Sequence, residues 1–224
     1  MAAFQDDARE EEMRQLFKLT KEGGRGDTDA ILTLNHEGKD VVVEFELKTT
    51  GHKSGSVTTV RDFGPDHIRK WKNKHWIFAF YSGKSVKYLY GSPALMKGWI
   101  DEKEEYITPD FKLAALASTK ITMSDLVAIC GHKTRYTLAD AKRIHKRQYD
   151  RDTYLAKMDQ DHGYSPQRML EILQDRVRYV MERGSTLNNP KIPPRYFGGW
   201  GTAIDENHPT KLRALVSLAL SGKI

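Results

Sequence analysis

Apolar and polar residues alternate along a stretch near the front of the chain, and this alternation predicts a β-strand. Successive side chains of a strand point to opposite faces, so the odd-numbered apolar residues of 41–47 share one face. The other face carries Val42, Glu44, Glu46 and Lys48. A second short apolar stretch, residues 30–34, comes before it, and residues 35–40 around Gly38 are typical of a turn. The pattern therefore predicts a β-hairpin.

Other segments predict an opening helix and a crossover connection. A helix is expected over residues 6–19, before the glycine-rich break at 23–26. Pro65 is typical of a first helical turn, here the start of a helix over 66–74. Two further strands, 76–81 and 86–90, should pair across a short turn. Because a strand, a helix and a returning strand form a crossover, strands 41–48 and 76–81 should lie parallel. Only two strands are visible before the crossover helix.

Beyond residue 91 the pattern becomes helical. Capping residues and glycine stops predict helices over residues 124–130, 137–159, 165–183 and 209–220. The helix pair around Gly131 loosely resembles a helix-turn-helix, and the Pro- and Gly-rich segment 188–201 is expected to be an ordered loop that contacts DNA or a second chain. We expect an α+β (mixed α/β) fold with a central mixed β-sheet, flanking helices and a helical C-terminal lobe. The expected division is residues 1–91 and 92–224, or one continuous domain.

Composition narrows the class of protein. In 224 residues, 36 Lys and Arg exceed 30 Asp and Glu, for a net charge of +6, which favours a polyanionic partner. No apolar run is long enough to span a bilayer and no signal-peptide pattern occurs, so no membrane partner is expected. A single cysteine, Cys130, suits a reducing cytoplasm and a place in the core. We expect a cytoplasmic protein encoded by a bacterium, an archaeon or a phage.

Basic residues cluster in two segments with interleaved aromatic residues. Residues 131–151 hold seven basic side chains against two acids, and residues 67–75 hold four and no acid. A basic surface with scattered aromatics is typical of binding to a phosphate backbone, although a solvated helix face has the same composition. The residues expected to contact DNA are Lys53, Arg61, Lys70, Lys133, Arg135, Arg143, Lys146, Arg147 and Arg195. Arg143 and Arg147, four positions apart, should share a helical face.

The predicted hairpin brings acidic residues together. If it folds about Glu37 and Gly38, Asp29 lies opposite Glu46, with Cβ atoms roughly 4.5–5.5 Å apart. Two acids at that separation can share a divalent cation, with Lys48 alongside. Asp27, one strand step from Asp29 on the same face, is the rival for the first acid.

This arrangement resembles the PD-(D/E)xK nuclease superfamily, which includes many type II restriction endonucleases. The motif here is Asp29 followed by Glu46-Leu47-Lys48, within residues 25–82, and Thr28 stands where the family name has proline. The resemblance implies catalytic roles for Asp29, Glu46 and Lys48. Mg²⁺ would be held by Glu46 together with Asp29, or with Asp27 in place of Asp29. Glu44 is an auxiliary candidate, and Glu11 and Glu12 are remoter ones. The resemblance also implies that the substrate is double-stranded DNA and that the protein is a homodimer.

Other functions fit the sequence less well. His132, His145 and Asn188 have the letters of an HNH nuclease without its spacing, and the histidines lack the pairing of a zinc site. A structure-specific nuclease of resolution or repair is the alternative within the same class. A non-catalytic DNA-binding regulator is the alternative from another class. A strand that ends in two acids and a lysine favours the enzyme.

Overall fold

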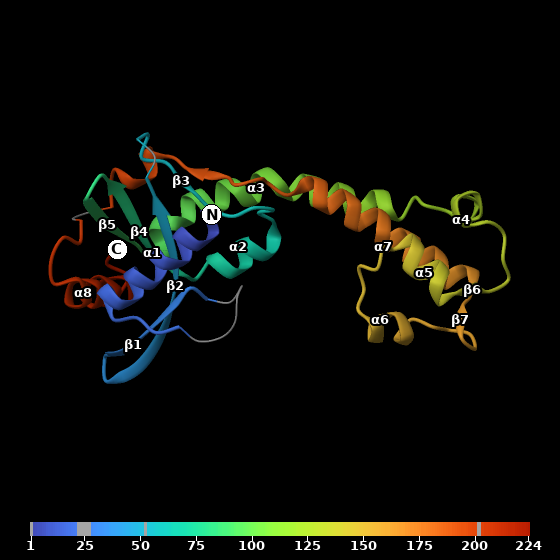
Figure 1. Cartoon of the computed structure of the whole chain (residues 1–224), viewed down its shortest axis with the longest axis horizontal. Coiled ribbons are helices and arrows are strands. Elements are labelled where there is room, and N and C mark those ends of the chain that lie inside the picture. The colour runs from blue at the N-terminus through green and yellow to red at the C-terminus, as the bar shows by residue number, and fades with distance from the viewer. Residues whose placement is uncertain (1, 22–27, 52, 201–202) are drawn as a thin grey trace. The chain divides into compact units, whose positions relative to one another are not determined.

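The chain divides into two compact units in the computed structural model (Figure 1), which describes residues 2–21, 28–51, 53–200 and 203–224. The first unit contains Met1–Glu105 and Leu187–Ile224, and the second contains Tyr106–Thr186. This division differs from the one expected from sequence, because the C-terminal segment groups with the N-terminal unit. Asp27 and the glycine-rich break at 23–26 lie outside the described residues.

The first unit is built on a four-stranded mixed sheet with helices around it, as the α+β prediction required. The strands follow the order β1-β2-β4-β5. Its elements are α1 (Ala2–Phe17), β1 (Ala30–His36), β2 (Lys39–Thr50), β3 (Val57–Thr58), α2 (Pro65–Trp71), β4 (His75–Ser82), β5 (Ser85–Gly91), the first part of α3 (Pro93–Ser118), β8 (Lys191–Ile192), the 3-10 helix η1 (Pro194–Phe197) and α8 (His208–Leu220). The short strands β3 and β8 form a separate antiparallel pair.

The hairpin and the crossover are confirmed. Strands β1 and β2 are antiparallel with Ala30 opposite Phe45, and the two turn residues Glu37 and Gly38 have φ angles of 51° and 80°. Positive φ at both central residues is the geometry of a tight hairpin turn. Strand β2 runs parallel to β4, and β4 is antiparallel to β5.

The two faces of the sheet pack against different layers. One face buries apolar side chains of β1, β2, β4 and β5 against α1 and α8. The residues packed there include Phe45 of β2, Phe17 of α1 and Val216 of α8. On the other face Trp76 and Phe78 of β4 stack on each other, and Trp76 packs edge-on against Trp71 of α2. Glu46 and Lys48 pair in register with Trp76 and Phe78, so they share this second face.

Aromatic residues of the segment 188–201 cover part of the second face. Phe197 and Trp200 both contact the Phe78 ring, and Trp200 is buried. The segment was predicted to be an ordered loop, and it also contains the short strand β8 and the 3-10 helix η1. Its aromatic side chains stabilise the first unit itself.

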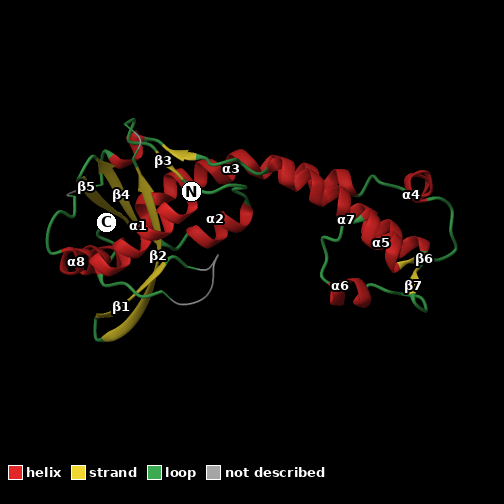
Figure 2. Ribbon diagram, viewed as in Figure 1, coloured by secondary structure: helices red, strands yellow, loops and turns green. Residues whose placement is uncertain are grey.

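The second unit is mainly helical (Figure 2). It contains the rest of α3, then α4 (Met123–Cys130), β6 (Tyr136–Thr137), α5 (Leu138–Ile144), α6 (Arg151–Ala156), β7 (Gly163–Tyr164) and α7 (Pro166–Ser185). Helices α4 and α5 both pack against α7. The predicted capping residues Thr137 and Ser165 accept hydrogen bonds from the amides of Asp140 and Arg168. Cys130 is buried in the core of this unit, as predicted.

The single helix predicted over residues 137–159 is wrong. Helix α5 ends before His145, and Lys146 and Arg147 have left-handed φ angles of 54° and 58°. Tyr149 then stacks on the buried His145 ring, and its hydroxyl donates to Asp175 of α7. Burial of these rings against α7 outweighs the local preference for a continuous helix. Arg143 and Arg147 therefore do not share one helical face.

Helix α3 was not predicted. It runs for 26 residues through Pro109, a residue that normally interrupts a helix. Its buried positions Ile100, Ile107 and Ala114 are seven residues, or about two helical turns, apart, and Trp99 lies next to the first of them. Packing along this stripe compensates for the hydrogen bond that the proline cannot donate.

Candidate active site at the exchange of strand partners on β2

Strand β2 pairs with β1 along its first part and, on its opposite edge, with β4 along its second part. The candidate catalytic residues lie near Phe45, where the two pairings meet. Strand β1 pairs with β2 from Lys39 to Phe45, whereas β4 pairs with it from Phe45 to Thr50. Beyond Phe45, none of the described strands pairs with the edge that β1 has left. The Leu47 amide on that edge donates to Asp29 Oδ2 at 3.0 Å, so the carboxylate of Asp29 takes the place of a strand partner.

The ammonium of Lys48 contacts both acidic residues. Its Nζ lies 2.6 Å from Glu46 Oε1 and 3.9 Å from Asp29 Oδ2. The Glu46 side chain is 6 % exposed, against 15 % for Lys48 and 22 % for Asp29. Arg14 of α1 donates to the backbone carbonyl of Asp29 at 3.1 Å and fixes that residue from the other side. The structure thus brings together the three residues singled out from the sequence.

Burial and mutual charge set the protonation of this group. Burial, together with the negative charge of Glu46, raises the pKa of Asp29. Burial alone would raise the pKa of Glu46, but the ammonium groups of Lys48, Lys74 and Lys70 together outweigh it and the net pKa is lowered. Burial would likewise lower the pKa of Lys48, but Glu46 and Asp29 outweigh it and the net pKa is raised. At neutral pH, Glu46 is therefore a carboxylate and Lys48 an ammonium.

A second lysine, which the sequence analysis did not single out for the site, lies on the far side of Glu46. Lys74 follows α2, is 2 % exposed, and has its Nζ 3.8 Å from Glu46 Oε2 and 3.6 Å from Glu44 Oε2. It donates to Thr28 Oγ1 at 3.0 Å, and that hydroxyl donates to Glu44 at 2.7 Å. The basic run at 67–75 contained Lys74, but nothing in the run distinguished a buried lysine from its exposed neighbours.

A further acid, Glu10 of α1, was missed. Its pKa is raised to about 7, mainly by burial and then by the charge of Asp29. Glu11, which the sequence analysis named as a remoter candidate, instead accepts hydrogen bonds from Arg14 and Gln15. Helical spacing does not single out Glu10, because Glu10 and Glu11 both form an ion pair with Arg14, at 3.8 and 2.9 Å.

The two carboxylates supply oxygen atoms of the kind that bind a divalent cation. Glu46 Oε2 is buried and accepts no hydrogen bond from the described residues, which leaves one oxygen of Glu46 free to bind a ligand. Mg²⁺ is commonly bound through one or two carboxylates while it keeps several waters. Within the described ranges, no three Asp, Glu, His or Cys side chains converge as a metal-binding group. Asp27, the rival first acid, lies outside the described residues.

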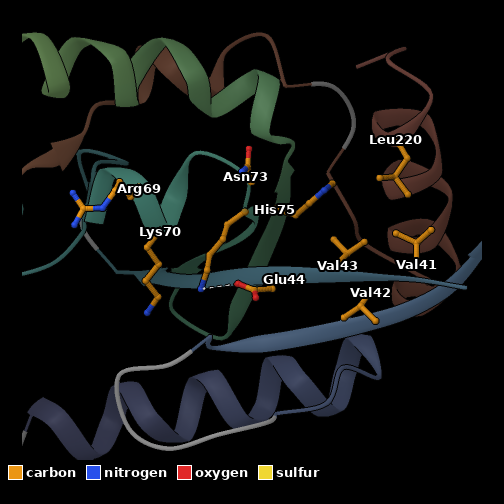
Figure 3. Close-up of a pocket in the computed structure, with 10 residues that line it drawn as sticks. Val41, Val42, Val43, Glu44, Arg69, Lys70, Asn73, His75 and Leu220 are labelled. Carbon is orange, nitrogen blue, oxygen red and sulfur yellow. Dashed lines mark ion pairs between the residues drawn. The ribbon is translucent and has the colours of Figure 1, made fainter. Parts of the chain in front are cut away.

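A cavity of about 420 Å³ adjoins this cluster on the opposite edge of β2 (Figure 3). It lies beside residues 41–44, where β4 has not yet begun, and Leu220 of α8 contributes to its wall. Arg69 and Lys70 of α2 line it together with Glu44. The cavity is therefore lined by cations on one wall and by apolar side chains on another.

The residues expected to bind DNA are divided between the two units. The first unit carries Lys53, Arg61, Lys70 and Arg195, and the second carries Lys133, Arg135, Arg143, Lys146 and Arg147. Several have protein partners: Lys133 pairs with Asp140 at 2.8 Å, and Arg195 lies 3.8 Å from Glu102. Arg143, Lys146 and Arg147 are exposed.

Two further observations concern the whole chain. No single described helix has the length and apolar composition needed to cross a membrane; α3 and α4, bent by 82°, meet those two criteria only as a pair. Comparison with protein-family models and with curated proteins finds no match. A functional assignment therefore rests on the residues of this chain.

Proposed function

We propose that this protein is a Mg²⁺-dependent endonuclease that cuts double-stranded DNA at a specific sequence, in the manner of a type II restriction enzyme. The observation that carries the proposal is the Lys48 ammonium held between the carboxylates of Glu46 and Asp29 at the end of β2. Burying two acids and a lysine at a strand end is costly. A nuclease of the PD-(D/E)xK type has a use for that arrangement.

The residues have separable tasks. A Mg²⁺ ion held by Asp29 and Glu46 would polarise the phosphate and acidify a water. Because the pKa of Lys48 is raised, this side chain stays an ammonium at neutral pH. Lys48 therefore suits the stabilisation of negative charge that develops on the phosphate, and the orientation of the attacking water, rather than removal of its proton.

Cations near the cluster supply a path for the DNA backbone. Arg69 and Lys70 line the cavity next to Glu44, and the Arg69 side chain is 72 % exposed. Phosphate contacts of this kind supply affinity without sequence information. Base contacts are assigned to the second unit, where Arg143 and Arg147 are exposed on separate segments.

Cutting both strands of a palindrome with one site per chain requires two chains related by a two-fold axis. Light scattering of the protein should then give about twice the chain mass of 25.7 kDa.

Digestion of plasmid DNA with variants of the cluster tests the proposal. Glu46→Gln and Lys48→Met should abolish cleavage in Mg²⁺ and leave binding in a gel-shift assay largely intact. Asp101→Asn is the matched control, because Asp101 pairs with Lys97 at an exposed position of α3. Discrete plasmid fragments from the unmodified protein and the control are the expected result.

The same assay separates the alternatives. Cleavage of branched DNA alone would move the assignment to a structure-specific nuclease. DNA binding without cleavage in any divalent ion would favour a non-catalytic regulator. Normal cleavage by Lys48→Met would refute the assigned chemistry.

A further inference from the structure

Lys74 is more deeply buried than the rest of the cluster, although the nuclease motif gives it no role. Only 2 % of its side chain is exposed. A lysine is almost never fully buried unless it is paired, and Lys74 pairs with Glu44, Glu46 and Thr28 at 3.6, 3.8 and 3.0 Å. Its neighbour Lys72 is exposed and pairs with Glu104 of α3.

The two oxygens of Glu46 face different ammonium groups. Lys48 donates a hydrogen bond of 2.6 Å to Oε1, whereas Lys74 lies 3.8 Å from Oε2, beyond hydrogen-bond distance. Oε2 accepts no hydrogen bond from the described residues. Lys74 therefore compensates the charge of Glu46 without occupying the lone pairs of Oε2.

We propose that Lys74 is a positioning residue for Glu46: its ammonium is a second counter-ion of that carboxylate, beside Lys48, and sets how tightly the site holds a divalent cation. The inference rests on the proposed function in one respect, that Glu46 is a metal ligand. Thr28 and Glu44 hold the ammonium in place, and the dashed line in Figure 3 marks its ion pair with Glu44.

The Lys74 ammonium should have opposite effects on the affinity for a divalent cation and on the rate of DNA cleavage. A carboxylate buried as deeply as Glu46 needs a nearby cation when no metal is bound. The same cation repels a divalent ion that binds Oε2, because like charges a few ångströms apart interact strongly in a partly buried site. Lys74 thus balances part of the charge of Glu46 and holds that carboxylate in place, at the expense of metal affinity.

The test uses the full-length protein, first without DNA to measure metal binding and then with plasmid DNA to measure cleavage. Calorimetric titration with Mn²⁺ at pH 8 is carried out on the unmodified chain, Lys74→Met, Lys74→Arg and Glu46→Gln. Lys74→Met should bind Mn²⁺ on the order of tenfold more tightly, yet cleave DNA more slowly. Lys74→Arg keeps the charge and should return Mn²⁺ affinity to within about threefold of the unmodified protein. Lys72→Met, which removes an exposed ammonium two residues away, should change neither quantity.

The outcomes are distinguishable. Weaker or unchanged Mn²⁺ binding by Lys74→Met overturns the inference, provided that Glu46→Gln abolishes binding. Mn²⁺ binding that Glu46→Gln leaves intact, or no binding by the unmodified chain, overturns the metal role of Glu46 and the inference with it. If Lys74→Met does not fold, Lys74→Gln decides, because it removes the charge and keeps a hydrogen-bond donor beside Thr28.

Discussion

The substitution Glu10→Gln should remove a pH dependence from the stability of the first unit. The pKa of Glu10 is raised from 4.5 to about 7, by burial and then by Asp29. The folded state therefore keeps the proton up to about pH 7, whereas the unfolded chain releases it near pH 4.5. Between these values the folded state binds more protons, so the contribution of Glu10 to stability falls as the pH rises.

The size of the effect follows from the pKa and from exposure. A rise from 4.5 to about 7 corresponds to about 3.4 kcal/mol at 1.36 kcal/mol for each pKa unit. The Glu10 side chain is 25 % exposed, and solvent screening reduces the effect. We expect the unmodified protein to lose roughly 1–2 kcal/mol more stability than Glu10→Gln between pH 5 and pH 8.

Tryptophan fluorescence during urea unfolding is the appropriate measurement. All four tryptophans belong to the unit that contains Glu10: Trp71, Trp76, Trp99 and Trp200. Free energies of unfolding at pH 5 and pH 8 are compared for the two proteins. The reasoning is refuted if Glu10→Gln loses as much stability between these pH values as the unmodified chain does.

Two further predictions concern the cavity and the second unit. The double substitution Arg69→Ala/Lys70→Ala should weaken binding to all duplex sequences alike and lower the slope of log K against log salt by about two. The control Lys72→Ala should leave this slope unchanged. An unaltered slope in the double variant would exclude the cavity from the DNA path. Gly163→Ala should destabilise the second unit by roughly 1–3 kcal/mol, because the new Cβ would lie 2.6 Å from a carbonyl oxygen of β6. Gly184→Ala, in α7 with open space around it, should instead stabilise by about 0.5–1 kcal/mol, and equal melting temperatures in circular dichroism for the two variants would contradict this account.

Short-range rules determined the part of the site that lies on the hairpin. Alternation along β2 places Glu46 and Lys48 on one face, and the Glu37-Gly38 turn fixes the register that puts Asp29 near Glu46. Both follow from backbone dihedrals within about 20 residues, and the sequence displays them directly. The parallel crossover to β4 was predictable for a related reason, the handedness of strand–helix–strand connections.

Only the tertiary structure decided the surroundings of those residues. Glu10 lies in α1, and Lys74 lies in the segment between α2 and β4. Each is buried against the sheet, whereas neighbouring residues of the same charge are exposed. The break after α5 arises in the same way, because Tyr149 gains more from packing on His145 and Asp175 than from continuing the helix. Periodicity records which face of an element is apolar. Which charged residue is buried, and beside which partner, depends on free energies of burial against segments distant in sequence.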